Sequence, residues 1–83
     1  MKDSAIIIFN IHKRNFTVDL EVPLNISAND LVNALNVAYE LGIDTTDIKN
    51  CYLKAESPIA LLKGDKTLAE FGIRNGSVIN FTE

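Results

Sequence analysis

The stretch AIIIFNIHKRNFTVDLEVPLNISANDLVNALNVAYELG, residues 5–42, contains the pattern of two strands followed by one helix. Residues 5–11 are rich in β-branched side chains, and residues 17–22 alternate apolar with polar side chains. Alternation with a period of two is typical of a half-buried strand. Only the polar residues 12–15 connect the two segments, which predicts an antiparallel hairpin. Pro23 ends the second strand, because proline cannot donate a hydrogen bond to a strand ladder.

The helix is predicted to begin at Ser27, whose hydroxyl can cap the backbone N–H of Asp30 while the Asp30 side chain reaches back. Gly42 can take the left-handed conformation that closes a helix. Apolar side chains repeat at spacings of three and four, which predicts one buried stripe. Its members are Leu31, Ala34, Leu35, Ala38 and Leu41.

The second half of the chain predicts three shorter strands, at residues 51–56, 59–62 and 77–82. The first of these has Cys51, Leu53 and Ala55 on one face, and the last points Ile79 and Phe81 inward. The connections are Ser57-Pro58, a turn at residues 63–65, a helical turn with three core side chains at residues 68–73, and an Asn75-Gly76 turn.

This element order predicts a two-layer α+β domain, in which one amphipathic helix covers one face of a mixed sheet. The first and last strands are expected side by side in the centre of the sheet. The order is that of a β-grasp with four to five strands. A chain of 83 residues is long enough for one such domain, so we expect a single domain over residues 1–83.

Composition excludes several classes of function. The net charge of −3 disfavours nucleic acid, since phosphate binding needs a basic face. Cys51 is the only cysteine, so no intramolecular disulfide and no Cys-rich metal site is expected. The apolar run at residues 5–9 is too short for a signal peptide, and no stretch approaches the roughly 20 apolar residues of a membrane span. We therefore expect a cytoplasmic protein without membrane insertion.

Three motifs resemble ubiquitin. TLAEFGIRNGSVI at residues 67–79 is similar to the ubiquitin segment TLSDYNI and the final strand that follows it. LEVP at residues 20–23 and Gly42-Ile43 after the helix also look like ubiquitin. The likeness to ubiquitin extends over nearly the whole chain and implies a ubiquitin-like β-grasp.

Within that superfamily, the chain resembles the YukD/EsaB-like group of small bacterial ubiquitin-fold proteins. The residues that carry this resemblance are VDLEVP at 18–23, the helix start a few residues later, and Leu68, Ile73 and Asn75-Gly76 before the last strand. The resemblance implies an accessory or regulatory component of type VII secretion that binds a protein partner, such as a component of the secretion system. Fold alone does not assign the mechanism.

The C-terminal residues differ from those of ubiquitin-type modifiers and sulfur carriers, which end in Gly-Gly on a flexible tail. Here the sequence ends at Phe81-Thr82-Glu83, which disfavours conjugation and sulfur transfer. Thr82 also stands where ubiquitin has the last-strand valine of its exposed apolar patch. Two alternatives stay open: a modifier or sulfur carrier whose Gly-Gly tail is absent from this sequence, and a ubiquitin-like domain of a larger protein.

Polar residues of the first connection offer little chemistry. His12 is the only histidine, and it reads as a solvated turn residue rather than a metal ligand. His12-Lys13-Arg14 forms a small positive patch, which fits either a solvated turn or a contact with an acidic partner. Cys51 has no neighbouring base and reads as a small buried hydrophobe.

Two further segments superficially resemble ligand sites. KGDKT at residues 63–67 lacks the first glycine and the strand–loop–helix setting of a phosphate loop. Asp44 and Asp47 lack the glycine and terminal Glu of a calcium loop. No nucleophile, base and orienting group can be combined, so we expect no enzyme, no cofactor and no metal.

The candidate binding surface lies on the face of the sheet opposite the helix. If Ile7, Phe9 and Ile11 point inward, Ile6 and Ile8 point outward. The predicted apolar stripe is Ile6, Ile8, Val78 and Tyr52, with a polar rim of Asp19, Glu21, Lys54 and Asn80. An apolar centre with a polar rim is typical of protein-binding surfaces. Ordinary strand composition left partly exposed also fits, and a register shift of one residue would swap the faces of the first strand.

The C-terminal residues generate a first prediction: the protein is not conjugated to other proteins. Epitope-tagged protein expressed in its native host should run as a single species under reducing, denaturing conditions. A ladder of higher-mass bands with isopeptide-linked Glu83 would contradict this expectation.

Overall fold

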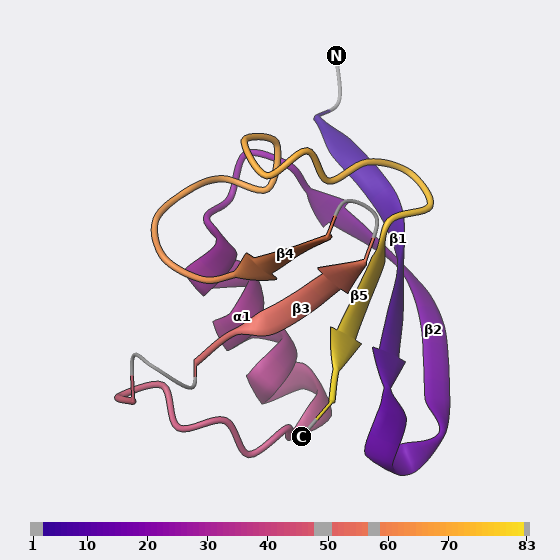
Figure 1. Ribbon diagram of the computed structural model, residues 1–83, viewed down its shortest axis with the longest axis vertical. Coiled ribbons are helices and arrows are strands. Elements are labelled where there is room, and N and C mark those ends of the chain that lie inside the picture. Colours follow the sequence, from indigo (N-terminus) through magenta and orange to yellow (C-terminus); the bar gives the residue numbers. More distant parts are fainter. Residues whose placement is uncertain (1–2, 48–50, 57–58, 83) are drawn as a thin grey trace.

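The first and last strands of the chain lie side by side in the middle of one five-stranded sheet (Figure 1). The computed structural model describes residues 3–47, 51–56 and 59–82. The strand order is β2-β1-β5-β3-β4, in which β1 and β5 run parallel and the other neighbours run antiparallel. The elements are β1 (Ser4–Ile11), β2 (Phe16–Pro23), α1 (Ala28–Tyr39), β3 (Leu53–Glu56), β4 (Ile59–Leu62) and β5 (Val78–Phe81).

The predicted α+β architecture, the N-terminal hairpin and the central pair of strands are confirmed. A short 3-10 helix, His12–Arg14, joins β1 to β2. The predicted interruption at Ser57-Pro58 lies outside the described residues, as does Glu83. None of the described helices has both the length and the apolar character that a membrane span requires.

The core forms between α1 and the inner face of the sheet. Ile7, Phe9 and Ile11 of β1 are buried, and Ile79 of β5 lies opposite Phe9. The predicted inward and outward faces of β1 are therefore confirmed. Each such side chain contributes roughly 1.5–3 kcal/mol when it is fully buried. The face of the sheet away from α1, called the open face below, points toward the viewer in Figure 1.

The helix begins where the sequence predicts, because the Ser27 hydroxyl accepts a hydrogen bond of 3.1 Å from the Asp30 N–H. The predicted stripe is only partly right. Leu31, Leu35 and Leu41 are buried as expected. Ala34 and Ala38 are exposed instead, and the side chains that α1 buries are Ala28, Leu31, Val32 and Leu35.

The reason for this rotation is the size of the competing side chains. Val32 is fully buried, and Tyr39 packs its ring 5.4 Å from that of Phe9. Valine and tyrosine remove more apolar area from water than two alanines do. The helix therefore turns the face with Val32 and Tyr39 toward the sheet and leaves Ala34 and Ala38 in solvent.

The C-terminal end of α1 also differs from the prediction. Glu40, with φ of 51°, takes the left-handed position after Tyr39, so the helix ends before Gly42. Arg14 donates hydrogen bonds of 2.6 and 2.7 Å to the carbonyl oxygens of Tyr39 and Glu40. A cation suits this position because the last carbonyls of a helix carry partial negative charge. Arg14 therefore caps the C-terminal end of α1, although its side chain stays exposed.

Reciprocal hydrogen bonds fix the turn that precedes β5, at residues 67–73. The Thr67 hydroxyl accepts from the Glu70 N–H, and the Glu70 carboxylate accepts from the Thr67 N–H at 2.9 Å, which is a reciprocal cap. The hydrogen bonds that the Glu70 carboxylate accepts from the N–H and the hydroxyl of Thr67 lower the pKa of Glu70. The predicted tight turn is confirmed, since Leu68 and Ile73 are buried and Phe71 packs against the core.

Two hydrogen bonds then tie this segment to β1. The Asn75 side-chain oxygen accepts from the Ile6 N–H at 2.8 Å, and the Gly76 N–H donates to the Ile6 carbonyl at 2.9 Å. Gly76 has φ of +87°, a left-handed conformation that favours glycine. The Asn75-Gly76 turn thus fixes the backbone of Ile6, a residue of the predicted binding surface.

Helix placement generates a stability prediction. Ser27→Ala should lower the free energy of unfolding by about 1 kcal/mol through loss of the N-cap. Leu35→Ala, which removes a buried side chain, should lower it by roughly 2–5 kcal/mol. Urea denaturation of both variants measures the difference. A larger loss for Ser27→Ala than for Leu35→Ala would contradict the packing of α1 described above.

Candidate functional site

Three apolar side chains meet on the open face where β1 runs beside β5. Ile8 lies opposite Val78 in the parallel pair, and Ile6 precedes Ile8 by two residues on the same face of β1. Ile6 is 54% exposed, whereas Ile8 and Val78 are half-buried. We call these three residues the β1–β5 patch. On the β2 side, Ile6 faces Glu21 and Ile8 faces Asp19, so this flank of the patch is acidic.

The opposite flank of the patch is not the one predicted. In the antiparallel pair of β3 and β5, Lys54 lies opposite Asn80, and continuing that register places Glu56 opposite Val78. Tyr52 precedes β3 and lies at the other end, away from Val78. The predicted stripe is therefore wrong at its Tyr52 end: Ile6, Ile8 and Val78 come together, but Tyr52 and Lys54 do not join them.

Asn80 lies at the centre of the open face and not on its rim. It is only 4% exposed. Its side-chain oxygen accepts from the Asn10 amide at 2.9 Å and lies 3.0 Å from His12 Nε2, and its amide donates to Glu56 Oε2. The Thr17 hydroxyl donates to the Asn10 side-chain oxygen at 2.8 Å. We call these five residues the Asn80 network. They form a polar row that borders the β1–β5 patch on the open face.

His12 therefore belongs to a hydrogen-bonded network on the sheet. This role could not be read from the sequence, because His12 and Asn80 are 68 residues apart. The edge strand β4 was also missed as a surface. Its Ile59 is 91% exposed and its Leu61 is 47% exposed. The sequence did indicate this exposed apolar surface, because none of the four residues of β4 is charged.

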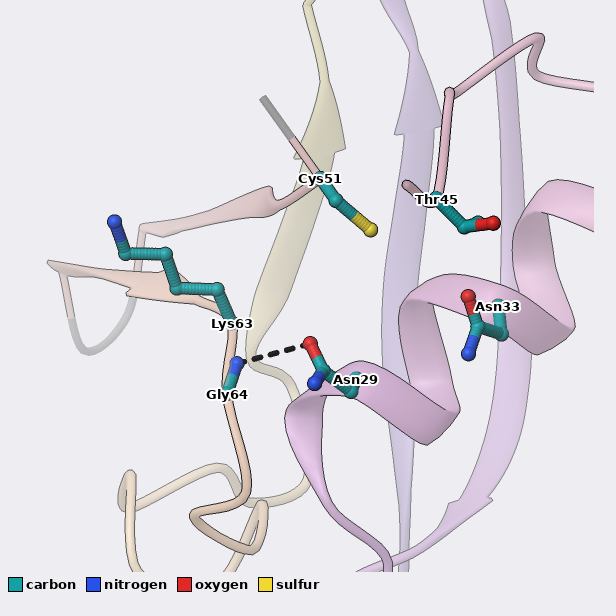
Figure 2. Close-up of a pocket in the computed structure, with 6 residues that line it drawn as sticks. All are labelled: Asn29, Asn33, Thr45, Cys51, Lys63 and Gly64. Carbon is teal, nitrogen blue, oxygen red and sulfur yellow. Dashed lines mark hydrogen bonds between the residues drawn. The ribbon is translucent and has the colours of Figure 1, made fainter. Parts of the chain in front are cut away.

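A pocket lies on the other side of the molecule, between α1 and the ends of β3 and β4 (Figure 2). Asn29 joins its two walls, because its side-chain oxygen accepts from the Gly64 N–H at 3.0 Å. Cys51 is buried here, as expected of a small hydrophobe. In Figure 2 the Lys63 side chain extends away from Asn29 and Asn33.

The loop after α1 is held by hydrogen bonds to one of its own aspartate side chains. Asp44 accepts hydrogen bonds from the hydroxyl and the backbone N–H of Thr46, and these hydrogen bonds lower the pKa of Asp44. Across the described parts of the chain, no three His, Cys, Asp or Glu side chains gather as metal ligands would.

Comparison with known proteins gives a family and a fold. The family model described as "WXG100 protein secretion system (Wss), protein YukD" matches residues 6–80. No curated protein sequence matches the chain. Among solved structures, the C-terminal ubiquitin-like domain of mouse tubulin-specific chaperone e is similar with a TM-score of 0.72 at 10% identity, over 95% of this chain and 84% of that one.

Two further structures agree. The ubiquitin-like domain of tubulin-binding cofactor B gives a TM-score of 0.69 at 21% identity, over 96% of this chain and 89% of that one. The UBL domain of Plasmodium falciparum Dsk2 gives 0.60 at 14% identity, over 93% and 96%. At such identities the likeness shows the fold alone. The predicted ubiquitin-like β-grasp is thereby confirmed.

The Asn80 network generates a prediction that depends on donor and acceptor identity. Asn80→Asp keeps the acceptor for Asn10 but replaces the donor to Glu56 with a second carboxylate. We expect the free energy of unfolding to fall by about 1–3 kcal/mol. Adding Glu56→Gln restores a donor between the two side chains and should recover part of the loss, as measured by urea denaturation of the four members of the cycle. Equal stability of Asn80→Asp and the parent would contradict the network.

Proposed function

The chain belongs to the YukD family of the WXG100 protein secretion system, and we propose that it serves that system as a non-catalytic module that binds another protein through the β1–β5 patch. One observation carries the proposal most. Ile6 leaves 54% of its surface in water although it lies on a central strand, next to Ile8 and Val78. Grouped apolar side chains on an exposed face are the usual anchors of protein interfaces.

The charges around the patch favour a partner of one kind. Asp19 and Glu21 flank it on β2, and Glu56 flanks it on β3. The chain as a whole carries a net charge of −3. Acidic side chains at the rim attract a basic surface and repel an acidic one. We therefore propose that the partner presents an apolar side chain with Lys or Arg beside it.

The backbone below the patch also supports a binding role. The Asn75-Gly76 turn holds both the N–H and the carbonyl of Ile6, and β5 holds Ile8 beside Val78. A surface that is ordered before binding loses little conformational entropy when the partner docks. The patch is thus suited to bind without a change of shape in this chain.

The test compares two aspartate substitutions. Ile8→Asp places a charge in the patch, and Val37→Asp makes the same change at a helix position that is 79% exposed and far from the sheet. We expect Ile8→Asp to weaken binding to a purified component of the secretion system by at least tenfold, about 1.4 kcal/mol, and Val37→Asp to leave it unchanged. Binding is measured by titration calorimetry, and folding by circular dichroism.

Two further variants complete this experiment. Ile6→Asp serves if Ile8→Asp proves poorly folded, since Ile6 is the more exposed of the two. Tyr52→Ala should have little effect, because Tyr52 lies away from the patch, whereas a true anchor would cost about 2 kcal/mol. Folded Ile8→Asp and Ile6→Asp proteins that bind as well as the parent would overturn the proposal.

A further inference from the structure

The two edges of the sheet are built differently. On the edge strand β2, the side chains of the open face are Thr17, Asp19 and Glu21, so two acidic groups stand along this edge. On the other edge, β4 offers Ile59 and Leu61 on the same face and no charge along its length. Charged side chains on an edge strand prevent pairing with another chain, and an apolar edge permits it.

In the described part of the structure, no other strand pairs with the outer edge of β4. Among the backbone hydrogen bonds that link turns and loops of the described residues, none involves Ile59–Leu62. On the open face a shallow apolar hollow lies along the strand, lined by Lys54, Glu56, Ile59, Leu61 and Asn80 with the backbone of β3 and β4. We propose that β4 pairs antiparallel with β4 of a second copy of this chain, which joins two sheets into one.

The alternation of side chains restricts how the two strands can pair. Residues directly opposite in an antiparallel pair point to the same face, so a continuous open face requires open-face residues to meet open-face residues. Four centred registers satisfy this condition, with Ile59, Ala60, Leu61 or Leu62 opposite its own copy on the twofold axis. Those centred on Ala60 or Leu61 pair three of the four strand residues, whereas those centred on Ile59 or Leu62 pair only one.

The neighbouring charges on β3 favour one of these registers. Glu56 lies beside Ile59, and Lys54 lies beside Leu61. A register centred on Ile59 sets Glu56 and its copy in one row, and a register centred on Leu61 does the same with Lys54, so like charges stand at the two ends of a row, about 14 Å apart, where their repulsion is weak but unfavourable. The register centred on Ala60 places Ile59 opposite Leu61 of the second copy, with Glu56 at one end of the row and Lys54 of the copy at the other. Only this register has opposite charges in every row, and its axis passes through a small side chain.

Such a contact is short, so the dimer is weak and depends on concentration. The open faces of both copies then point the same way, which puts two β1–β5 patches on one surface. A partner with two matching sites would bind such a pair more tightly than a single copy.

Disulfide formation tests the register directly. In a Cys51→Ala background, Ala60→Cys brings two Cα atoms to about 4.5–5.5 Å across the axis, within the range that a disulfide spans. Leu61→Cys in the same background is the matched control, because its two Cα atoms lie diagonally about 8 Å apart, too far for a disulfide. Under mild oxidation Ala60→Cys should form covalent dimers at least tenfold faster than Leu61→Cys. Equal rates would overturn the register.

Sedimentation equilibrium tests the association itself. The average mass of the parent protein should rise from 9.2 kDa toward twice that value as its concentration increases to the millimolar range. Leu61→Lys should abolish the rise, and Val37→Lys, the same change on the exposed side of α1, should leave it intact. A parent protein that stays at 9.2 kDa throughout would overturn the proposal, whatever the outcome of partner binding at the β1–β5 patch.

Discussion

The parallel pairing of β1 with β5 is the contact on which the rest of the structure depends. It joins residues that are 70 positions apart, such as Asn10 and Asn80, and it brings Phe9 beside Ile79 in the core. Parallel neighbours cannot be joined by a tight turn, so everything between them must form the connection. That connection supplies the helix, which covers one face of the pair and leaves the other in water.

The same pairing creates both the β1–β5 patch and the Asn80 network. Ile8 meets Val78 only because β1 and β5 run side by side in this register, and Asn10 meets Asn80 for the same reason. A shift by one residue would send the apolar set into water and the polar set into the core. Because Phe9 and Ile79 must both be buried, the register of β1 against β5 is fixed. That register also fixes the positions of the β1–β5 patch and of the Asn80 network.

Sequence reasoning succeeded where the deciding forces are local. The hairpin, the Ser27 cap and the alternation along β1 follow from neighbours within a few residues, and each was predicted correctly. It failed where distant segments decide. Tyr52 was placed beside Val78 because the sequence does not give the register of β3 against β5, and Asn80 was placed on a rim although three distant side chains enclose it.

Arg14 illustrates the same limit of sequence reasoning. Its hydrogen-bond acceptors are two main-chain carbonyls more than 20 residues away, so the residues next to Arg14 in the sequence do not predict this contact.

The Asn80 network finally explains why the open face can carry two separate apolar surfaces. A continuous apolar stripe from Ile6 to Leu61 would be a large exposed patch on a small domain, which invites unspecific association. Asn80 and its partners interrupt that stripe with polar groups that satisfy one another, and no described buried side-chain nitrogen or oxygen is left without a hydrogen-bond partner. A polar row that is satisfied internally gains little from a new ligand. It therefore separates the β1–β5 patch from the β4 edge, with Glu56 on the border of both surfaces.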